Sequence, residues 1–419
     1  MPLLRPPPPT LTRRRLLGGA AGAAASLAFP LPALAAPAAP AFTHGLQSGD
    51  VQGDRAVLWA RADRDARLLV EWDTTEGFAQ PRRLVGPAAL EDSDFTAKLR
   101  VTGLPPDQTI FWRARWLDLR DVNRRSAPLT GRFRSAPATR RDVSFVWSAD
   151  TCGQGWGINE DWGGYRLYET MRRFAPDFFV HCGDTIYADG PLQAEVPLPD
   201  GTLWRNLVTP EKAKVAETLD EFRGNHRYNL LDRNLLAFNA EVPTVALWDD
   251  HDVLDNWYPA ERLEADARYG ETSVALLAAR ANRAFLEYLP VSEHDFDRER
   301  LYRSLRYGPH LELFLLDARS HRGPNGPNDQ AEAGAATAYF GTRQVNWLLQ
   351  GLKKSTATWK AIVNGSPLGL LVPDGFGPGA GKDFEGAANG DGPPRGRELE
   401  IAQLLRGIRD AGIGNVVWF

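Results

Sequence analysis

The sequence predicts an α/β protein with a layered core, preceded by a small all-β segment. Short runs of alternating apolar and polar residues fill residues 41–138, and Gly, Pro and Asp clusters separate them. Evenly spaced strands with such turn signals are typical of a β-sandwich. After residue 140, apolar runs alternate with helical segments, which favours a sheet flanked by helices. A chain of 419 residues has room for both parts, so we expect domains at 41–138 and 141–419.

The first of these domains should consist of short strands. The turn at 103–106 resembles the entry to a late strand of a fibronectin-like module, and residues 135–139 have the composition of a linker. The strands are expected at 56–60, 68–72, 97–101, 110–116 and 131–134.

The second domain should alternate strands with helices. A helix is expected at 164–175, where apolar residues share one face and Pro176 ends it. Residues 189–240 and 256–300 are polar, helix-rich insertions, and the Gly-rich stretch 373–396 should be a surface loop. The strands are expected at 143–148, 178–181, 244–248, 313–316, 359–363 and 415–419.

The N-terminus has the layout of an export signal. Arg13, Arg14 and Arg15 precede a modestly apolar run, and small residues at 33–35 form a cleavage site. The arginine pair is typical of the twin-arginine route, so we expect residues 1–35 to direct the protein to the periplasm or the medium. The run is too short and too weakly apolar for a transmembrane segment. A disordered basic tail is the alternative interpretation.

Charge and cysteine content narrow the class of partner. The formal net charge is −4, although the N-terminal arginines contribute only positive charge. An acidic body argues against specific nucleic-acid binding and against an anionic membrane surface. With only two cysteines, the chain has no disulfide framework. A soluble, metal-holding protein agrees with this composition.

Residues of metal-ligand type follow three successive predicted strands. Asp150 and Cys152 follow the first strand, and Asp184 and Tyr187 follow the second. The run 249–252, which reads Asp-Asp-His-Asp, follows the third. Sites in such cores gather at the carboxyl ends of strands. Hydrolysis of a phosphate ester needs cations that neutralise its oxygens, and Asp184 is placed to bridge two of them.

These clusters resemble a known family. Asp-x-Cys at 150–152, Gly-Asp at 183–184 and Asp-His-Asp at 250–252 are similar to the spaced signature of calcineurin-like metallophosphoesterases, with Cys for His in the first motif and Asp for Asn in the third. Both departures, and Tyr187 after the Gly-Asp pair, resemble the PhoD-like phosphatase branch. Segments 45–50, 57–61, 316–322 and 364–367 extend the resemblance over nearly all of residues 42–419.

The resemblance implies a site and an activity. Cys152, Asp184 and Tyr187 would hold a ferric ion (Fe3+), and Asp150 and Asp250 would lie beside calcium ions (Ca2+), with other divalent metals possible. The protein would be a monomeric, exported hydrolase of phosphate monoesters or diesters. The substrate, whether a small ester, a phospholipid or a teichoic-type polymer, stays open.

Two further residues receive catalytic roles. His251 would contact the phosphate or the leaving oxygen, with a packed position behind the metals as the alternative. Arg319 would bind phosphate or form an ordinary salt bridge.

Three alternatives remain at this stage. Cys152 and Cys182 could form a disulfide in an oxidising compartment. The protein could be a calcineurin-like phosphodiesterase with another metal pair, such as zinc or manganese. It could also be a non-catalytic exported binding protein with a degenerate core.

The C-terminal end of the sequence carries one more expectation. The family takes further ligands from an Asp-Val-His segment after a late strand, whereas this sequence ends in the strand 415–419 and its last histidine is His321. We therefore expect a core that is incomplete at the C-terminus, weak metal retention and little activity in this chain.

Overall fold

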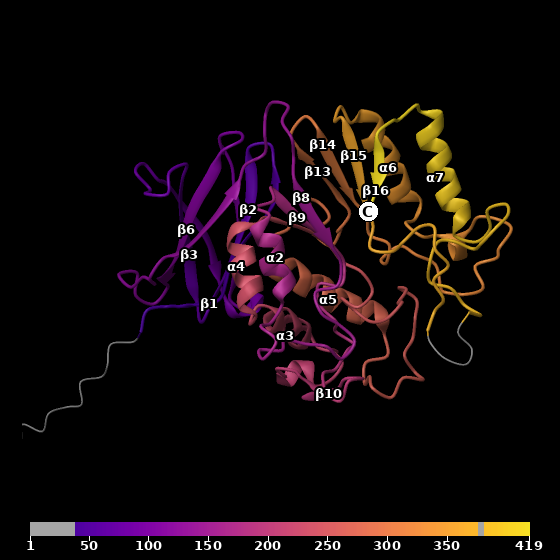
Figure 1. The fold of residues 1–419 in the computed structure, drawn as a ribbon, viewed down its shortest axis with the longest axis horizontal. Coiled ribbons are helices and arrows are strands. Elements are labelled where there is room, and N and C mark those ends of the chain that lie inside the picture. The colour runs from indigo at the N-terminus through magenta and orange to yellow at the C-terminus, as the bar shows by residue number, and fades with distance from the viewer. Residues whose placement is uncertain (1–37, 376–380) are drawn as a thin grey trace, which may run out of the picture. The chain divides into compact units, whose positions relative to one another are not determined.

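The computed structural model describes residues 38–375 and 381–419 (Figure 1). The predicted signal peptide at 1–35 lies outside these residues. Within the described ranges, no helix combines the length and apolar character needed to cross a membrane. Residues Pro40–Phe419 belong to one unit, whose described strands form a six-stranded sheet, two four-stranded sheets and a small hairpin.

The six-stranded sheet joins the N-terminal segment to the later α/β part. Its order is β5-β2-β1-β12-β9-β8. The first three strands are antiparallel neighbours and the last three are parallel. The junction is the parallel pair β1 and β12, registered at Gly49 and Thr244. The bounds are β1 Phe42–Gln52, β2 Arg55–Ala62, β5 Thr96–Val101, β8 Phe145–Ser148, β9 Phe178–Cys182 and β12 Thr244–Leu247.

An antiparallel four-stranded sheet completes the N-terminal sandwich. Its central strand β6 buries every second residue, including Trp112 and Trp116, as a strand with one face on the core must. Full burial of each such side chain contributes about 2 kcal/mol. The order is β4-β3-β6-β7, with β3 Ala66–Asp73, β4 Arg82–Ala89, β6 Thr109–Asp118 and β7 Leu129–Arg134.

The second four-stranded sheet lies toward the C-terminus. In Figure 1 it stands beside helices α6 and α7. Phe314 and Ile362 of this sheet pack against Leu348 and Leu404 of the two helices. Its order is β13-β14-β15-β16, with β13 Arg303–Tyr307, β14 Leu311–Leu315, β15 Trp359–Val363, β16 Val416–Trp418, α6 Thr342–Lys354 and α7 Glu398–Asp410.

The helices of the two insertions begin at residues that cap them. Thr218 and Glu221 form a capping box at α3, and the Asp232 carboxylate accepts two backbone N–H groups at the start of α4. Tyr168 and Met171 of α2 pack with Phe238 of α4. The bounds are α2 Arg166–Arg173, α3 Leu219–Asn229, α4 Arg233–Glu241 and α5 Val274–Tyr288, with a hairpin β10 Glu195–Pro197 and β11 Leu203–Arg205 and short 3-10 turns η1 Glu91–Ser93, η2 Pro210–Lys212 and η3 Ala335–Thr337.

The sequence located the main strands and missed some others. Each predicted strand is present, with ends that differ by a few residues, whereas β1, β4, β13 and the β10–β11 hairpin were not predicted. One core cluster contains Leu58, Trp112 and Leu313, which come from all three larger sheets. Because one sheet takes strands from both sides of residue 138, the division into domains at that residue stays a prediction.

The β1–β12 junction should tolerate no side chain at Gly49. A Cβ atom there would lie 2.4 Å from the Thr244 carbonyl oxygen and 2.5 Å from that of Pro290, and both are backbone atoms. We expect Gly49→Ala to lower the free energy of unfolding by about 2 kcal/mol or more, because the two parts of the sheet must separate. Urea unfolding measures this loss.

Gly77→Ala is the matched control, since nothing lies within 4 Å of a Cβ at that exposed position. Its effect should stay within about 0.5 kcal/mol. Equal effects of the two substitutions would show that the junction does not depend on close backbone approach.

Candidate metal centre

The site is assembled where three parallel strands end. Strands β8, β9 and β12 are neighbours, so their carboxyl ends share one edge of the six-stranded sheet. Asp150 and Asp184, which follow β8 and β9, have left-handed backbones with φ of 56° and 53°. The Asp150 N–H donates to the Gly183 carbonyl at 3.2 Å, and the Thr151 N–H donates to that of Asp184 at 3.1 Å. These bonds fasten the two loops to each other.

Three buried carboxylates lie together at this edge. One oxygen from each of Asp184, Asp249 and Asp250 falls within 4.8 Å of the others. Asp250 also belongs to a second group of this kind, with His251 and Asp255. Burial and the charges of Asp250 and Asp249 raise the pKa of Asp184 well above its usual range. The cluster therefore needs positive charge if its members are to be ionised.

Arg319 supplies part of that charge from inside the protein. Its Nε atom donates to Asp249 at 2.6 Å and its Nη2 atom to Asp250 at 3.1 Å, while Nη1 forms an ion pair with Glu385 at 2.9 Å. Its side chain is only 1% exposed. Of the two roles predicted for Arg319, the salt bridge is thus present, and the contact with phosphate stays a prediction.

His251 is held beside the carboxylates by Asp189. Its Nδ1 atom lies 2.8 Å from Asp189 Oδ1, and its backbone N–H donates to Asp184 at 3.1 Å. The ring stacks on Tyr187 with centroids 4.3 Å apart. Burial alone would lower the pKa of His251, but the hydrogen bond and charge of Asp189, together with Asp250 and Asp255, raise it to about 9. The imidazole is therefore ready to carry a proton.

Tyr187 and Cys152 occupy different surroundings. The Tyr187 hydroxyl donates to Asp150 at 2.5 Å. The Cys152 thiol donates to the Trp156 carbonyl, and burial raises the pKa of this thiol to about 11, although Tyr165 and Lys212 act to lower it. Cys152 is in neither of the two ligand groups found among the described residues. The structure brings Asp184 and Asp250 together, and the ligand roles of Cys152 and Tyr187 stay predictions.

The two cysteines are both free thiols, so the structure does not contain the disulfide considered above. Asp189, Asp249 and Asp255 were not among the predicted ligands, although Asp249 directly precedes the Asp-His-Asp motif and the other two follow a motif by a few residues. Glu385, which pairs with Arg319, comes from the Gly-rich stretch and gave no signal in the sequence.

The donors present fit a hard cation. Carboxylate oxygens suit calcium and similar ions, which prefer oxygen ligands. Arg319 contacts two of the three clustered carboxylates, Asp249 and Asp250, and the negative charge that is left would be balanced by a cation. The carboxylate half of the predicted site therefore fits bound metal.

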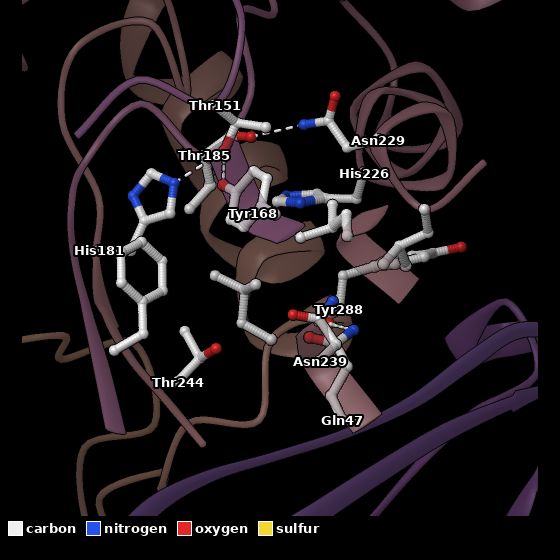
Figure 2. A pocket seen from close by; sticks show the side chains of 14 residues that line it. Gln47, Thr151, Tyr168, His181, Thr185, His226, Asn229, Asn239, Thr244 and Tyr288 are labelled. Atoms are coloured by element: carbon white, nitrogen blue, oxygen red, sulfur yellow. Dashed lines mark hydrogen bonds between the residues drawn. The ribbon is translucent and has the colours of Figure 1, made fainter. Parts of the chain in front are cut away.

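A small buried pocket lies behind the strand ends (Figure 2). Its volume is about 50 Å³. Thr151 lies 2.8 Å from His181 Nε2 and 3.0 Å from the Tyr168 hydroxyl, and the Asn229 amide donates to the Thr185 carbonyl at 2.6 Å. Because Thr151 and Thr185 each follow a predicted ligand, these hydrogen bonds fix the loops that carry Asp150 and Asp184.

Comparison with known proteins gives a consistent result. A family model described as PhoD-like phosphatase matches residues 145–419, and one described as its N-terminal domain matches residues 27–137. Alkaline phosphatase D of Bacillus subtilis (strain 168) is 27% identical over 398 residues, which are 90% of this chain and 63% of that protein. The chain thus spans less than two thirds of the length of that relative.

One solved structure confirms the predicted fold class. A structure described as PhoD matches with a TM-score of 0.69 and 23% identity, and the match covers 91% of this chain and 72% of that one. A purple acid phosphatase from yellow lupin (Lupinus luteus) matches with a TM-score of 0.46 and 13% identity, over 78% of this chain and 51% of that one.

Removing the buried arginine should destabilise the fold. Arg319→Met would leave Asp249, Asp250 and Glu385 without their shared cation, so we expect the free energy of unfolding to fall by about 3–5 kcal/mol. Urea unfolding in the presence of a chelator measures this. Arg343→Met is the control, because Arg343 is 76% exposed and forms a surface ion pair with Asp297 at 3.4 Å. That loss should be about 1 kcal/mol at most; an equally small loss for Arg319→Met would contradict the countercharge role.

Proposed function

The chain belongs to the PhoD-like phosphatase family, and from this premise we propose that it hydrolyses phosphate esters at the carboxylate edge of its six-stranded sheet. The observation that carries the proposal is the meeting of Asp184, Asp249 and Asp250 within 4.8 Å at buried strand ends, with His251 beside them. Alkaline phosphatase D, the relative reported above, supports the reaction class. A metal site of this kind is also what such a hydrolysis needs.

Asp184, Asp249, Asp250 and Asp255 would hold the cations. Cations bound there supply the positive charge that neutralises phosphate oxygens and activates water. His251 would donate a hydrogen bond, and then its proton, to the leaving oxygen through Nε2. Asp189 would keep the ring in position for this transfer by accepting from Nδ1, which lies 2.8 Å away.

Arg319 would act mainly by holding carboxylates in place. Its nitrogens already contact Asp249, Asp250 and Glu385, so a direct phosphate contact would require it to leave one of them. We therefore propose that Arg319 is a positioning residue whose charge keeps the ligands ionised.

Calcium is the metal that the oxygen-rich ligand groups favour. A ferric ion held by Cys152, Asp184 and Tyr187 is proposed from the resemblance of their motif. The second candidate is a calcineurin-like hydrolase with another metal pair, and one observation favours it. The Cys152 thiol faces the Trp156 carbonyl, and Cys152 is in neither ligand group.

Asp184→Asn should remove both metal and activity. We expect bound metal, measured by plasma mass spectrometry, and hydrolysis of 4-nitrophenyl phosphate and its bis-ester to fall by about 100-fold, because the substitution removes one of the carboxylates that would hold the metal. Chelation followed by addition of calcium, iron, zinc or manganese would identify the metal that restores turnover.

Asp410→Asn is the matched control. It makes the same chemical change at an exposed carboxylate at the end of α7, whose partner is Arg409. Full turnover and metal content in Asp184→Asn would rule out this site. A specific loss of iron in Cys152→Ser would decide for the iron-containing alternative.

We also propose that residues 1–35 direct export by the twin-arginine route. Changing both Arg13 and Arg14 to lysine should leave the precursor inside the cell, because that route reads the arginine pair. Immunoblotting of cell and periplasmic fractions checks this, with Arg5→Lys as the control outside the pair. Normal secretion of the double variant would point to the general secretory route.

A further inference from the structure

Three tryptophans form a cluster on the surface beside the candidate metal centre. The ring of Trp204 lies 5.7 Å from that of Trp156, at an interplanar angle of 86°, and 5.1 Å from that of Trp162, at 59°. Trp162 is 51% exposed and Trp156 is 39% exposed. Large aromatic side chains gathered at a surface mark a binding site more often than scattered apolar residues do. We call these three residues the tryptophan platform.

The platform is built to be rigid. Asn206 accepts from Trp204 Nε1 at 2.8 Å and from the Gly157 N–H at 2.7 Å. The amide of Asn206 donates to the carbonyls of Gly155 and Gln193 at 2.9 and 2.7 Å. One side chain thus ties β11, which carries Trp204, to the loop that carries Trp156. A preformed aromatic surface loses little conformational entropy when a ligand binds.

The platform begins next to the proposed site of hydrolysis. Trp156 lines one crevice together with Cys152 and Tyr187. Tyr187 donates to Asp150 and stacks on His251, so only one ring separates the crevice from the ligand groups. An ester whose phosphate lies at the carboxylates could therefore extend its remaining part over Trp156 and Trp162.

The charges around the platform narrow the kind of ligand. Arg205 lies between two carboxylates, 3.5 Å from Asp161 and 3.3 Å from Glu195, and all three side chains are more than half exposed. The positive charge is thereby balanced, so the platform offers no basic surface to an anionic membrane or to nucleic acid. Its exposed indole faces belong to the same segments as these charged groups, since Arg205 follows Trp204 and Asp161 precedes Trp162.

We propose that the tryptophan platform binds the neutral sugar rings of a phosphorylated carbohydrate. The apolar C–H face of a pyranose can stack on an indole ring, and its hydroxyl groups can hydrogen-bond to the carboxylates and to the guanidinium. The proposal rests on the proposed function for the phosphate end of the substrate. Binding of the sugar end is a separate property that requires no turnover.

Calorimetric titration with neutral oligosaccharides tests this binding directly. The full chain would be titrated with maltohexaose, cellohexaose, mannohexaose and chitohexaose, and we expect it to bind at least one of them. Trp162→Ala should weaken that binding by roughly fivefold or more, because it removes the most exposed stacking surface. Trp162→Tyr keeps an aromatic face and should restore most of the affinity.

Trp359→Ala is the matched control. Trp359 is 49% exposed, close to the value for Trp162, but lies on β15 outside the platform. This substitution should leave oligosaccharide binding unchanged. Thermal unfolding of each variant would verify that it is folded, and Trp162→Gln, which also lacks an aromatic face, replaces Trp162→Ala in the comparison if the alanine variant is not.

Several outcomes would overturn the proposal. The first is that none of the four oligosaccharides binds, and the second is that Trp162→Ala binds them as tightly as the unchanged chain does. The third is that the protein sediments with vesicles of phosphatidylcholine and phosphatidylglycerol, and that this sedimentation depends on Trp162. Hydrolysis of 4-nitrophenyl phosphate is measured separately. Oligosaccharide binding without hydrolysis would contradict the proposed function and support sugar binding at the platform. Hydrolysis without oligosaccharide binding would support the proposed function and contradict sugar binding at the platform.

Discussion

Mutual repulsion of buried carboxylates is the constraint on which the rest of the structure depends. Asp184, Asp249 and Asp250 are all buried and lie close enough to share ions. Such a group stays charged only where opposite charge is close and fixed. Arg319 meets part of that need from the protein itself, and Glu385 holds the arginine from its other side. The remaining negative charge is the basis for the proposal that cations bind at this edge of the sheet.

The sheet explains how these groups can be held against their repulsion. Parallel strands β8, β9 and β12 place their ends at one edge, and the Gly49–Thr244 junction ties them to the antiparallel strands of the N-terminal sandwich. Large buried side chains such as Trp112 make that sandwich a rigid support. The N-terminal segment therefore contributes to the site through the sheet, although no predicted ligand comes from it.

The insertions between the strands act as a second support. The buried Lys212 of η2 donates to the Tyr187 carbonyl at 2.7 Å and to Asn225 of α3 at 2.9 Å. Asn229 of α3 holds the Thr185 carbonyl, and Tyr168 of α2 contacts Thr151. A segment predicted as a polar insertion, 189–240, and the predicted helix at 164–175 thus hold the loops after β8 and β9. The same insertion carries Trp204 of the tryptophan platform.

The sequence by itself determined which strand ends carry the proposed ligands. Apolar runs that stop at Asp150, Asp184 and the 249–252 cluster must bring these residues to one edge, because parallel neighbouring strands end together. It also predicted the β-sandwich, since apolar and polar residues alternate along segments such as 110–116. Only the tertiary structure decided the side-chain partners. Asp189 reaches His251 across 62 positions, and Arg319 reaches Asp249 across 70. Such pairs form because distant segments pack together in the fold, so no local pattern in the sequence predicts them. The direction of the Cys152 thiol likewise depends on the loop around Trp156 and on the helices behind it, which no spacing of residues along the chain could fix.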